Sequence, residues 1–264
     1  MTHSTDRELD AFLTGLMPRL GELARNGFED PGPVRFKTRG QPVTATDREI
    51  ERIAMEAILS RWPDHAILGE ESGHTRGEAE VTWFIDPLDG TANFVHGLPF
   101  FSVSIGVARG GRMVAGHVLD PLRDEHFRAV EGGGAWLGGR RLVMEDPPDL
   151  LHANVSMQTS AGGAYMQKPG FFRDLHRRTQ KTRKLGSMAL ELAYVAAGRL
   201  DLLIAGKSSP QAWWDLAGGW KLVEEAGGTL VDLDGLEITP ETSHLVAGPE
   251  PLVREFLEWF EGYE

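Results

Sequence analysis

The chain has 264 residues, enough to bury a large core, and its hydrophobic share of 41% is ordinary for a globular protein. Its 39 acidic residues outnumber 27 lysines and arginines, and the net charge of −12 disfavours sequence-independent binding to nucleic acid or to an anionic membrane. Cysteine is absent, which excludes disulfides, thiolate metal ligands and a cysteine nucleophile. The start of the chain lacks the apolar core of a signal peptide, and no apolar run approaches the ~20 residues of a membrane span, so we expect a cytoplasmic protein.

The first half of the chain predicts two helices followed by a sheet. Apolar residues at helical spacing predict a helix over 8–25, kinked or broken at Pro18, and a second helix near Thr46, where Thr46 and Glu49 have capping-box spacing. The stretch 30–42 is rich in proline, glycine and basic residues and predicts a long, mobile loop. Short β-like runs predict an antiparallel sheet with a hairpin near Arg109 to Arg112; they lie at 66–69, 81–85, 101–108, 112–119 and 125–130.

The second half alternates strand and helix, which predicts a separate, mixed sheet. The expected strands lie near 153–157 and 200–205, and the expected helices near 170–179, 187–197, 215–227 and 250–262. Because the pair Pro147-Pro148 interrupts regular structure, we expect two subdomains, an α+β subdomain over 1–150 and an α/β subdomain over 151–264. One side of the last helix is apolar and could pack internally or in an oligomer; it carries Leu252, Phe256, Trp259 and Phe260.

The most informative segment is an apolar strand that runs into a turn with two aspartates, Asp86 and Asp89. A turn can bring side chains three residues apart together, and the Leu88 carbonyl between them can give a third oxygen to a hard cation. The amides of Gly90 and Thr91, which follow, can hold a phosphate oxygen. An isolated Asp-Pro-x-Asp is more often a pair of turn caps, but the extended motif favours a metal and anion site.

Two further acidic positions stand at the ends of predicted elements. Glu70 and Glu71 follow an apolar strand, where paired glutamates on their own usually indicate a solvated loop. Asp215 opens a helix after Trp213-Trp214, and in isolation an N-cap role is as good an interpretation as a metal ligand. One aspartate can serve as both.

Three stretches in this order resemble the inositol monophosphatase family, and the resemblance covers nearly the whole chain. They are Gly69-Glu70-Glu71, the segment from Asp86 to Phe94, and Trp214-Asp215-Leu216-Ala217-Gly218, with support from 43–47, 132–136 and Leu185-Gly186-Ser187. The resemblance implies a layered α-β-α-β-α sandwich, with an antiparallel N-terminal sheet and a mixed C-terminal sheet. It also implies a homodimer and a site that the second subdomain completes.

The resemblance also implies roles for particular residues. Two or three Mg²⁺ ions would be bound by Glu70, Asp86, the Leu88 carbonyl, Asp89 and Asp215. Asp47 and Thr91 would position and deprotonate the attacking water, with Glu70 also counted as catalytic. The candidate phosphate and substrate contacts are Gly90, Thr91, Ser187 and Ser208. From the sequence alone Asp47 is as well explained as a first-turn acid favoured by the helix dipole.

The chemistry that these residues support is hydrolysis of a phosphate monoester. The ester dianion repels hydroxide and has a poor leaving group, and two Mg²⁺ ions about 3.5–4 Å apart address both problems. Four carboxylates balance the charge of two such ions, and oxygen ligands suit magnesium.

The substrate is less well defined than the reaction. Family members that select inositol phosphate usually carry an acid seven positions before the last aspartate, where this chain has Ser208. We therefore expect a polyol or sugar phosphate similar to inositol 1-phosphate, with histidinol phosphate as the first alternative. Fructose 1,6-bisphosphate and 3′-phosphoadenosine nucleotides are further alternatives, and a non-catalytic interaction protein is a third hypothesis.

Several nearby residues have simpler explanations. Lys37 and Lys207 are expected to be solvated, although Lys207 could contact a second anionic group, and Glu71 could bind a further metal or lie at the surface. His96 and His117 are expected to be structural. Trp213 and Trp214 could line the substrate pocket, but a place in the core is the better interpretation.

Overall fold

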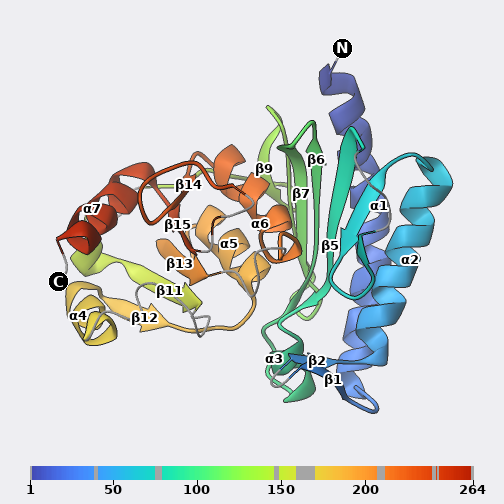
Figure 1. The fold of residues 1–264 in the computed structure, drawn as a ribbon, viewed down its shortest axis with the longest axis horizontal. Coiled ribbons are helices and arrows are strands. Elements are labelled where there is room, and N and C mark those ends of the chain that lie inside the picture. Colours follow the sequence, from blue (N-terminus) through green and yellow to red (C-terminus); the bar gives the residue numbers. More distant parts are fainter. Residues whose placement is uncertain are drawn as a thin grey trace.

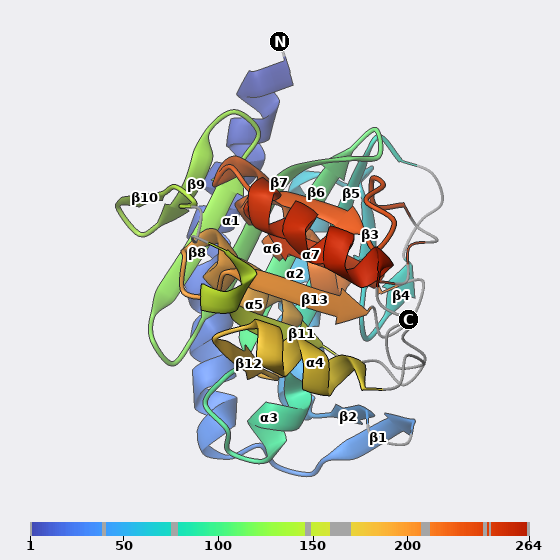
Figure 2. The ribbon, with the colours of Figure 1, turned by 90° about the vertical axis from the view of Figure 1, so that its left-hand side faces the viewer.

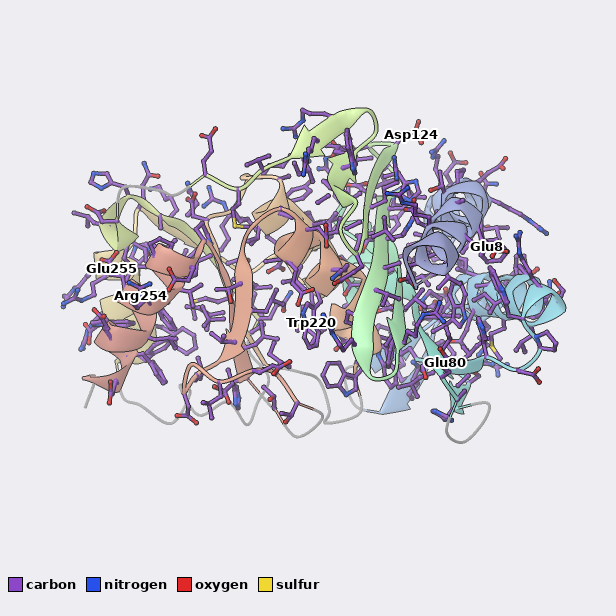
Figure 3. The ribbon with its side chains drawn as sticks, turned by 90° about the horizontal axis from the view of Figure 1, so that it is seen from above. Glu8, Glu80, Asp124, Trp220, Arg254 and Glu255 are labelled. Carbon is purple, nitrogen blue, oxygen red and sulfur yellow. The ribbon has the colours of Figure 1, made fainter. Side chains whose placement is uncertain are left out.

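The computed structural model describes residues 2–38, 41–74, 79–145, 149–158, 170–206, 212–239, 242 and 244–262. Its elements stack as α-β-α-β-α, which confirms the predicted fold class (Figure 1). The first outer layer holds α1 (Thr2–Glu29) and α2 (Ala45–Arg61), and the other holds α4 (Phe171–Arg178) and α7 (Glu250–Glu261). Between the two sheets lie α5 (Met188–Ala196) and α6 (Trp214–Glu225) (Figure 3).

The first sheet has the strand order β10-β9-β8-β7-β6-β5-β3-β4. Its neighbours are antiparallel except β3 and β5, which run parallel. The hairpin expected at 109–112 joins β6 to β7. The strands are β3 (Ala66–Gly69), β4 (Gly73–His74), β5 (Val81–Asp89), β6 (Ser102–Arg109), β7 (Arg112–Asp120), β8 (Glu125–Val130), β9 (Gly134–Leu137) and β10 (Arg140–Leu142).

Three local predictions in the first layer are wrong. Pro18 lies inside α1 without ending it, because the helix buries an apolar face on the sheet through Leu13 and Leu20. The capping box of α2 is formed by Thr44 and Asp47, two residues before the pair that the spacing suggested. The stretch expected as a loop pairs into a hairpin beside the short helix α3 (Thr91–Val95): β1 (Arg35–Thr38) and β2 (Gln41–Val43).

The second sheet is mixed, as predicted, with the order β12-β11-β13-β15-β14. The strand β11 is parallel to β12 and β13, whereas β15 is antiparallel to β13 and β14. The helix α7 buries its apolar side against this sheet, so that side packs internally (Figure 2). The strands are β11 (Asn154–Gln158), β12 (Lys181–Arg183), β13 (Leu202–Gly206), β14 (Thr229–Asp232) and β15 (His244–Gly248).

The middle helix layer joins the two sheets into a shared interior. One apolar cluster includes Phe127 of the first sheet, Leu203 of the second, and the buried faces of α5 and α6. Pro147 and Pro148 lie outside the described residues, so the division into subdomains at residue 150 stays a prediction. No helix among the described residues is long and apolar enough to cross a membrane.

Glycines let α6 lie directly on the first sheet. A Cβ placed on Gly218 would overlap the Ser104 hydroxyl and come within 2.9 Å of the His117 carbonyl oxygen. A Cβ on Gly116 of β7 would in turn overlap the carbonyl of Gly218. This close approach fixes the distance between α6 and the strands that carry the site.

We therefore expect Gly218→Ala to lower the free energy of unfolding by about 1–3 kcal/mol, because backbone on the sheet cannot move aside cheaply. The matched control is Gly15→Ala, an exposed glycine inside α1 with nothing within 4 Å of an added Cβ. That change is expected to raise the free energy of unfolding by about 0.5–1 kcal/mol. Urea unfolding checks both, and equal effects would contradict the close contact.

Candidate active site

Four acidic residues come together where β5 ends and α6 begins. Asp86 and Asp89 lie at the end of β5, and Asp215 lies in the first turn of α6. Glu70 follows β3, and its amide donates to the Ile85 carbonyl of β5 at 3.1 Å. The register against β6 gains one residue between Asp86 and Asp89, a bulge of the kind that redirects side chains beside active sites.

The four carboxylates repel one another; Asp86 and Asp89 are buried, and Glu70 and Asp215 are half-buried. Burial is the main cause that raises the pKa of Asp86 well above its ordinary value, and the negative charges of Glu70, Asp89 and Asp215 raise it further. The side chain of Asp86 is only 2% exposed. A cluster of this kind is compensated by cations, and an all-oxygen donor set fits Mg²⁺.

The carboxylates have protein partners in this arrangement, including the Leu88 amide, which donates to Asp86 at 3.0 Å. The described residues contain no group of three or more acidic or histidine side chains already positioned to hold a metal ion. Glu70 accepts a hydrogen bond from the Lys37 ammonium at 3.1 Å, and Asp89 is bound to α5. The donor set therefore fits magnesium by chemistry and charge, while its convergence on an ion requires these contacts to change.

Asp89 caps α5 from another part of the chain. Its carboxylate accepts from the Ser187 hydroxyl at 2.5 Å, the Met188 amide at 3.0 Å and the Ala189 amide at 2.8 Å. Burial raises the pKa of Asp89, and these donors act in the opposite direction. Ser187 is fully buried and its hydroxyl is directed at Asp89.

Asp47 and Thr91 are in contact, as the sequence analysis expected. The Thr91 hydroxyl lies 3.1 Å from Asp47 Oδ1 and 2.9 Å from the Leu88 carbonyl oxygen. The other Asp47 oxygen accepts from the Thr44 amide at 2.8 Å and from the Thr44 hydroxyl at 2.5 Å. Burial raises the pKa of Asp47, and its hydrogen bonds oppose that effect.

Gly90 adopts the left-handed conformation, with φ of 96°, as the residue that begins α3. A Cβ there would lie 3.1 Å from the Gly186 carbonyl oxygen and 3.2 Å from that of Phe100. The neighbouring Asn93 joins the same two segments, since its amide donates to the carbonyls of Phe100 and Leu185 at 2.7 Å each. The β5 turn and the start of α5 are thereby locked together. Ser208 and Lys207 lie outside the described residues.

Lys37 is exposed, as expected, and it is also paired with acidic residues that the sequence did not assign to it. Its ammonium forms ion pairs with Glu70 and Glu71. The side chain of Glu71 is only 8% exposed, and burial raises its pKa to about 7. The β1–β2 hairpin places this lysine over the two glutamates, an arrangement that no local pattern in 30–42 indicated.

Sequence reasoning missed two buried glutamates that support the site. Glu51 of α2 accepts from the amides of Glu71 and Ser72 at 2.9 and 2.8 Å, and so holds the turn behind Glu70. Glu191 of α5 accepts from the Ser156 hydroxyl at 2.6 Å and from the Gly186 amide at 2.8 Å. A single acid in an otherwise apolar helix was the available signal for Glu191.

The histidines have structural contacts. His117 is fully buried between Asp10, at 3.0 Å from its Nε2, and His126, at 2.9 Å from its Nδ1. His96 is exposed, and its Nδ1 lies 2.8 Å from the Ala92 carbonyl oxygen. These contacts support a structural role for both.

The family model described as the inositol monophosphatase family matches residues 5–259. The chain belongs to this family. A relative from Pasteurella multocida, named Nus factor SuhB, is 39% identical over 90% of this chain and 90% of its own. Inositol monophosphatase 1 of Solanum lycopersicum is 36% identical over 90% of this chain and 88% of its own. The inositol monophosphatase structure from Anabaena (Nostoc) sp. PCC 7120 aligns with a TM-score of 0.85 at 30% identity, over 98% of this chain and 97% of that one.

Glu191 gives this family member a testable dependence of stability on pH. Burial raises its pKa from 4.5 to about 7 in the folded chain. Its contribution to stability is therefore complete below pH 4.5 and is lost as the pH rises through 7. We expect the free energy of unfolding of Glu191→Gln, relative to the unaltered protein, to increase between pH 5 and 8. Urea unfolding in EDTA measures this, with Glu22→Gln on the exposed face of α1 as the control. A difference that does not change with pH contradicts the assignment.

Proposed function

We propose that this family member hydrolyses small phosphate monoesters in a Mg²⁺-dependent reaction. The observation that carries the proposal is the gathering of Glu70, Asp86, Asp89 and Asp215, with the pKa of buried Asp86 raised by burial and by the other three charges. Structural carboxylates are rarely collected in this way without a cation. The Asp47–Thr91 contact beside the cluster supplies the second part of a hydrolytic site.

The metal-holding groups in this proposal are Glu70, Asp86, the Leu88 carbonyl, Asp89 and Asp215. Magnesium bound there supplies a lowered pKa for a coordinated water and compensates the charge of the phosphate and of the leaving oxygen. The number of ions, two or three, is part of the proposal. Before binding, Lys37 is the cation that compensates Glu70 and Glu71.

Thr91 and Asp47 are proposed to move the proton of the attacking water. The Thr91 hydroxyl can accept a proton from water while donating its own to Asp47 Oδ1, 3.1 Å away. Thr44 fixes the other Asp47 oxygen, so that Oδ1 stays directed at Thr91. Glu70 is also proposed as a catalytic residue, because it lies close enough to Asp86 for its charge to raise the pKa of that carboxyl.

The amides of Gly90 and Thr91 are proposed to hold the phosphate. Gly90 leaves no side chain in the way, and its conformation is fixed by the contacts with Gly186 and Phe100. Ser187 was a candidate substrate contact. We propose instead that it positions Asp89, because its hydroxyl donates to that carboxylate at 2.5 Å. A substrate contact by Ser208 stays a proposal.

The substitution Asp86→Asn tests metal binding without disturbing the fold. The substitution keeps the shape of the side chain and removes its charge, so the metal-free protein is expected to be at least as stable as the unaltered one. Mg²⁺ is expected to raise the unfolding midpoint of the unaltered protein only, and Mg²⁺-dependent phosphate release is expected to fall at least 100-fold. Thermal unfolding with and without Mg²⁺, together with a phosphate-release assay, measures these effects.

The matched control is Asp234→Asn, an exposed aspartate in the turn after β14. It loses the same charge and should retain both activity and stabilisation by Mg²⁺. Normal phosphate release by Asp86→Asn would exclude the proposed metal site.

The proposed substrate is a polyol or sugar phosphate similar to inositol 1-phosphate. The similarity to inositol monophosphatase 1 of Solanum lycopersicum supports it, whereas Ser208 at the position of the usual acid favours a test of other esters. Histidinol phosphate is the first alternative, followed by fructose 1,6-bisphosphate and 3′-phosphoadenosine nucleotides.

A panel of these esters, ranked by kcat/KM at saturating Mg²⁺, decides among them. We expect inositol 1-phosphate or a sugar phosphate to lead. A lead of at least tenfold for histidinol phosphate would transfer the assignment to that ester while leaving the metal chemistry intact.

A non-catalytic interaction protein is the remaining hypothesis, and the similarity to a protein named Nus factor SuhB keeps it under test. The net charge of −12 argues against sequence-independent binding of nucleic acid or membranes. For the proposed phosphatase, we also propose that the chain forms a homodimer and that it is cytoplasmic. Hydrolysis of none of the esters with Mg²⁺ present would favour the non-catalytic role.

A further inference from the structure

A pocket of about 350 Å³ lies between α6, β5 and the tip of the β6–β7 hairpin. Its volume falls in the range of about 300–1,000 Å³ that is usual for small-molecule sites. None of the residues proposed for metal or phosphate binding lines it. The lining side chains include Thr82, Phe84, Trp213, Trp220, Lys221 and Glu237.

The pocket and the carboxylate cluster lie on different sides of α6. Trp213, Trp220 and Glu224 fall on one stripe of the helix, at spacings of seven and four residues. Asp215 is two residues from Trp213, which turns its side chain roughly 200° away at about 3.6 residues per turn. On β5, Phe84 of the pocket and Asp86 of the cluster share one face of the strand, so the pocket adjoins the proposed catalytic site without including its residues.

Aromatic rings in contact with one another form one wall of the pocket. Trp213 and Trp220 are stacked, with centroids 5.5 Å apart and planes at 21°, and Phe84 lies 6.4 Å from Trp213. The Trp220 ring is fixed because its Nε1 donates to Glu224 at 2.7 Å. Figure 3 shows Trp220 on α6 in the space between the two sheets. A fixed wall costs little entropy to order when a ligand binds.

The two tryptophans leave apolar surface uncovered. Trp83 of the same protein is completely buried, whereas Trp213 and Trp220 are only partly buried and face the pocket. Tryptophan buries a large area when it belongs to a core. A flat ring laid against this wall would cover the exposed surface and stack on the indoles.

The charged side chains around the pocket favour a ligand with a hydrogen-bond donor. Lys221 forms ion pairs with Glu131 and Glu224, and Arg112 lies 3.5 Å from Glu131. Glu237 has no ion-pair partner among the described residues and contributes its carboxylate to the lining. That carboxylate can accept an N–H from a ring substituent.

We propose that this pocket binds a planar heteroaromatic ring that carries an N–H donor. A purine base is the simplest member of the class, and adenine is the probe. The ring stacks on the Trp213–Trp220 pair, and its amino group donates to Glu237.

The test is a titration of the full chain with adenine in EDTA, followed by saturation-transfer NMR, with cyclohexanol as a non-planar apolar comparison. We expect saturable binding of adenine and none of cyclohexanol. Trp220→Leu should weaken adenine binding at least tenfold and Glu237→Ala several-fold. Trp136→Leu on β9, outside the pocket, is the matched control and should leave binding unchanged.

Thr82→Phe keeps both tryptophans and fills the pocket, so it tests the proposal even if Trp220→Leu does not fold. We expect it to abolish adenine binding without lowering the unfolding midpoint. The proposal is overturned if adenine does not bind or if Thr82→Phe binds it as well as the unaltered protein. Displacement of adenine by inorganic phosphate with Mg²⁺ overturns it too, because the ligand then occupies the proposed catalytic site.

Discussion

The repulsion among buried carboxylates at the end of β5 is the constraint on which the site depends. A strand, a turn and a helix place Asp86 close enough to three other acids that burial and their charges raise its pKa well above the usual range. The fold tolerates this cost because rigid neighbours hold the backbone. Glycine contacts fix α6 on the sheet, and Glu51 holds the turn behind Glu70. A cation that neutralises these carboxylates removes the repulsion, so the repulsion favours cation binding.

The same cluster connects the two halves of the chain. Asp89 of the first sheet binds the start of α5, and Glu191 of α5 accepts a hydrogen bond from Ser156 of the second sheet. Gly186 lies between these contacts, against Gly90 and Asn93. A shift of either sheet would therefore be transmitted through α5 to Asp89.

The sequence predicted the features that depend on neighbouring residues or on the order of motifs along the chain. The motif from Asp86 to Phe94 carries its turn chemistry in consecutive residues, and the helical and strand periods located most elements. The β1–β2 hairpin was missed because its pairing depends on contacts across the fold, including Lys37 with Glu70. Glu191 was missed for a similar reason, since its partners come from a distant strand and a distant loop. The short strands β4 and β10 are too brief to leave a period in the sequence.

Helix starts around the site lower the cost of gathering acids in a protein that is already acidic. Asp47 is in the first turn of α2, Asp89 binds the first amides of α5, and Asp215 is in the first turn of α6. Each helix start carries a partial positive charge, which favours a carboxylate there and lowers the cost of gathering several. Asp47 completes the capping box of α2 and Asp89 accepts from the first amides of α5, whereas Asp215 lies in the first turn of α6 without being its N-cap residue. Because the helix dipoles offset part of the negative charge before any ion binds, the local field at the site is less negative than the net charge of −12 suggests.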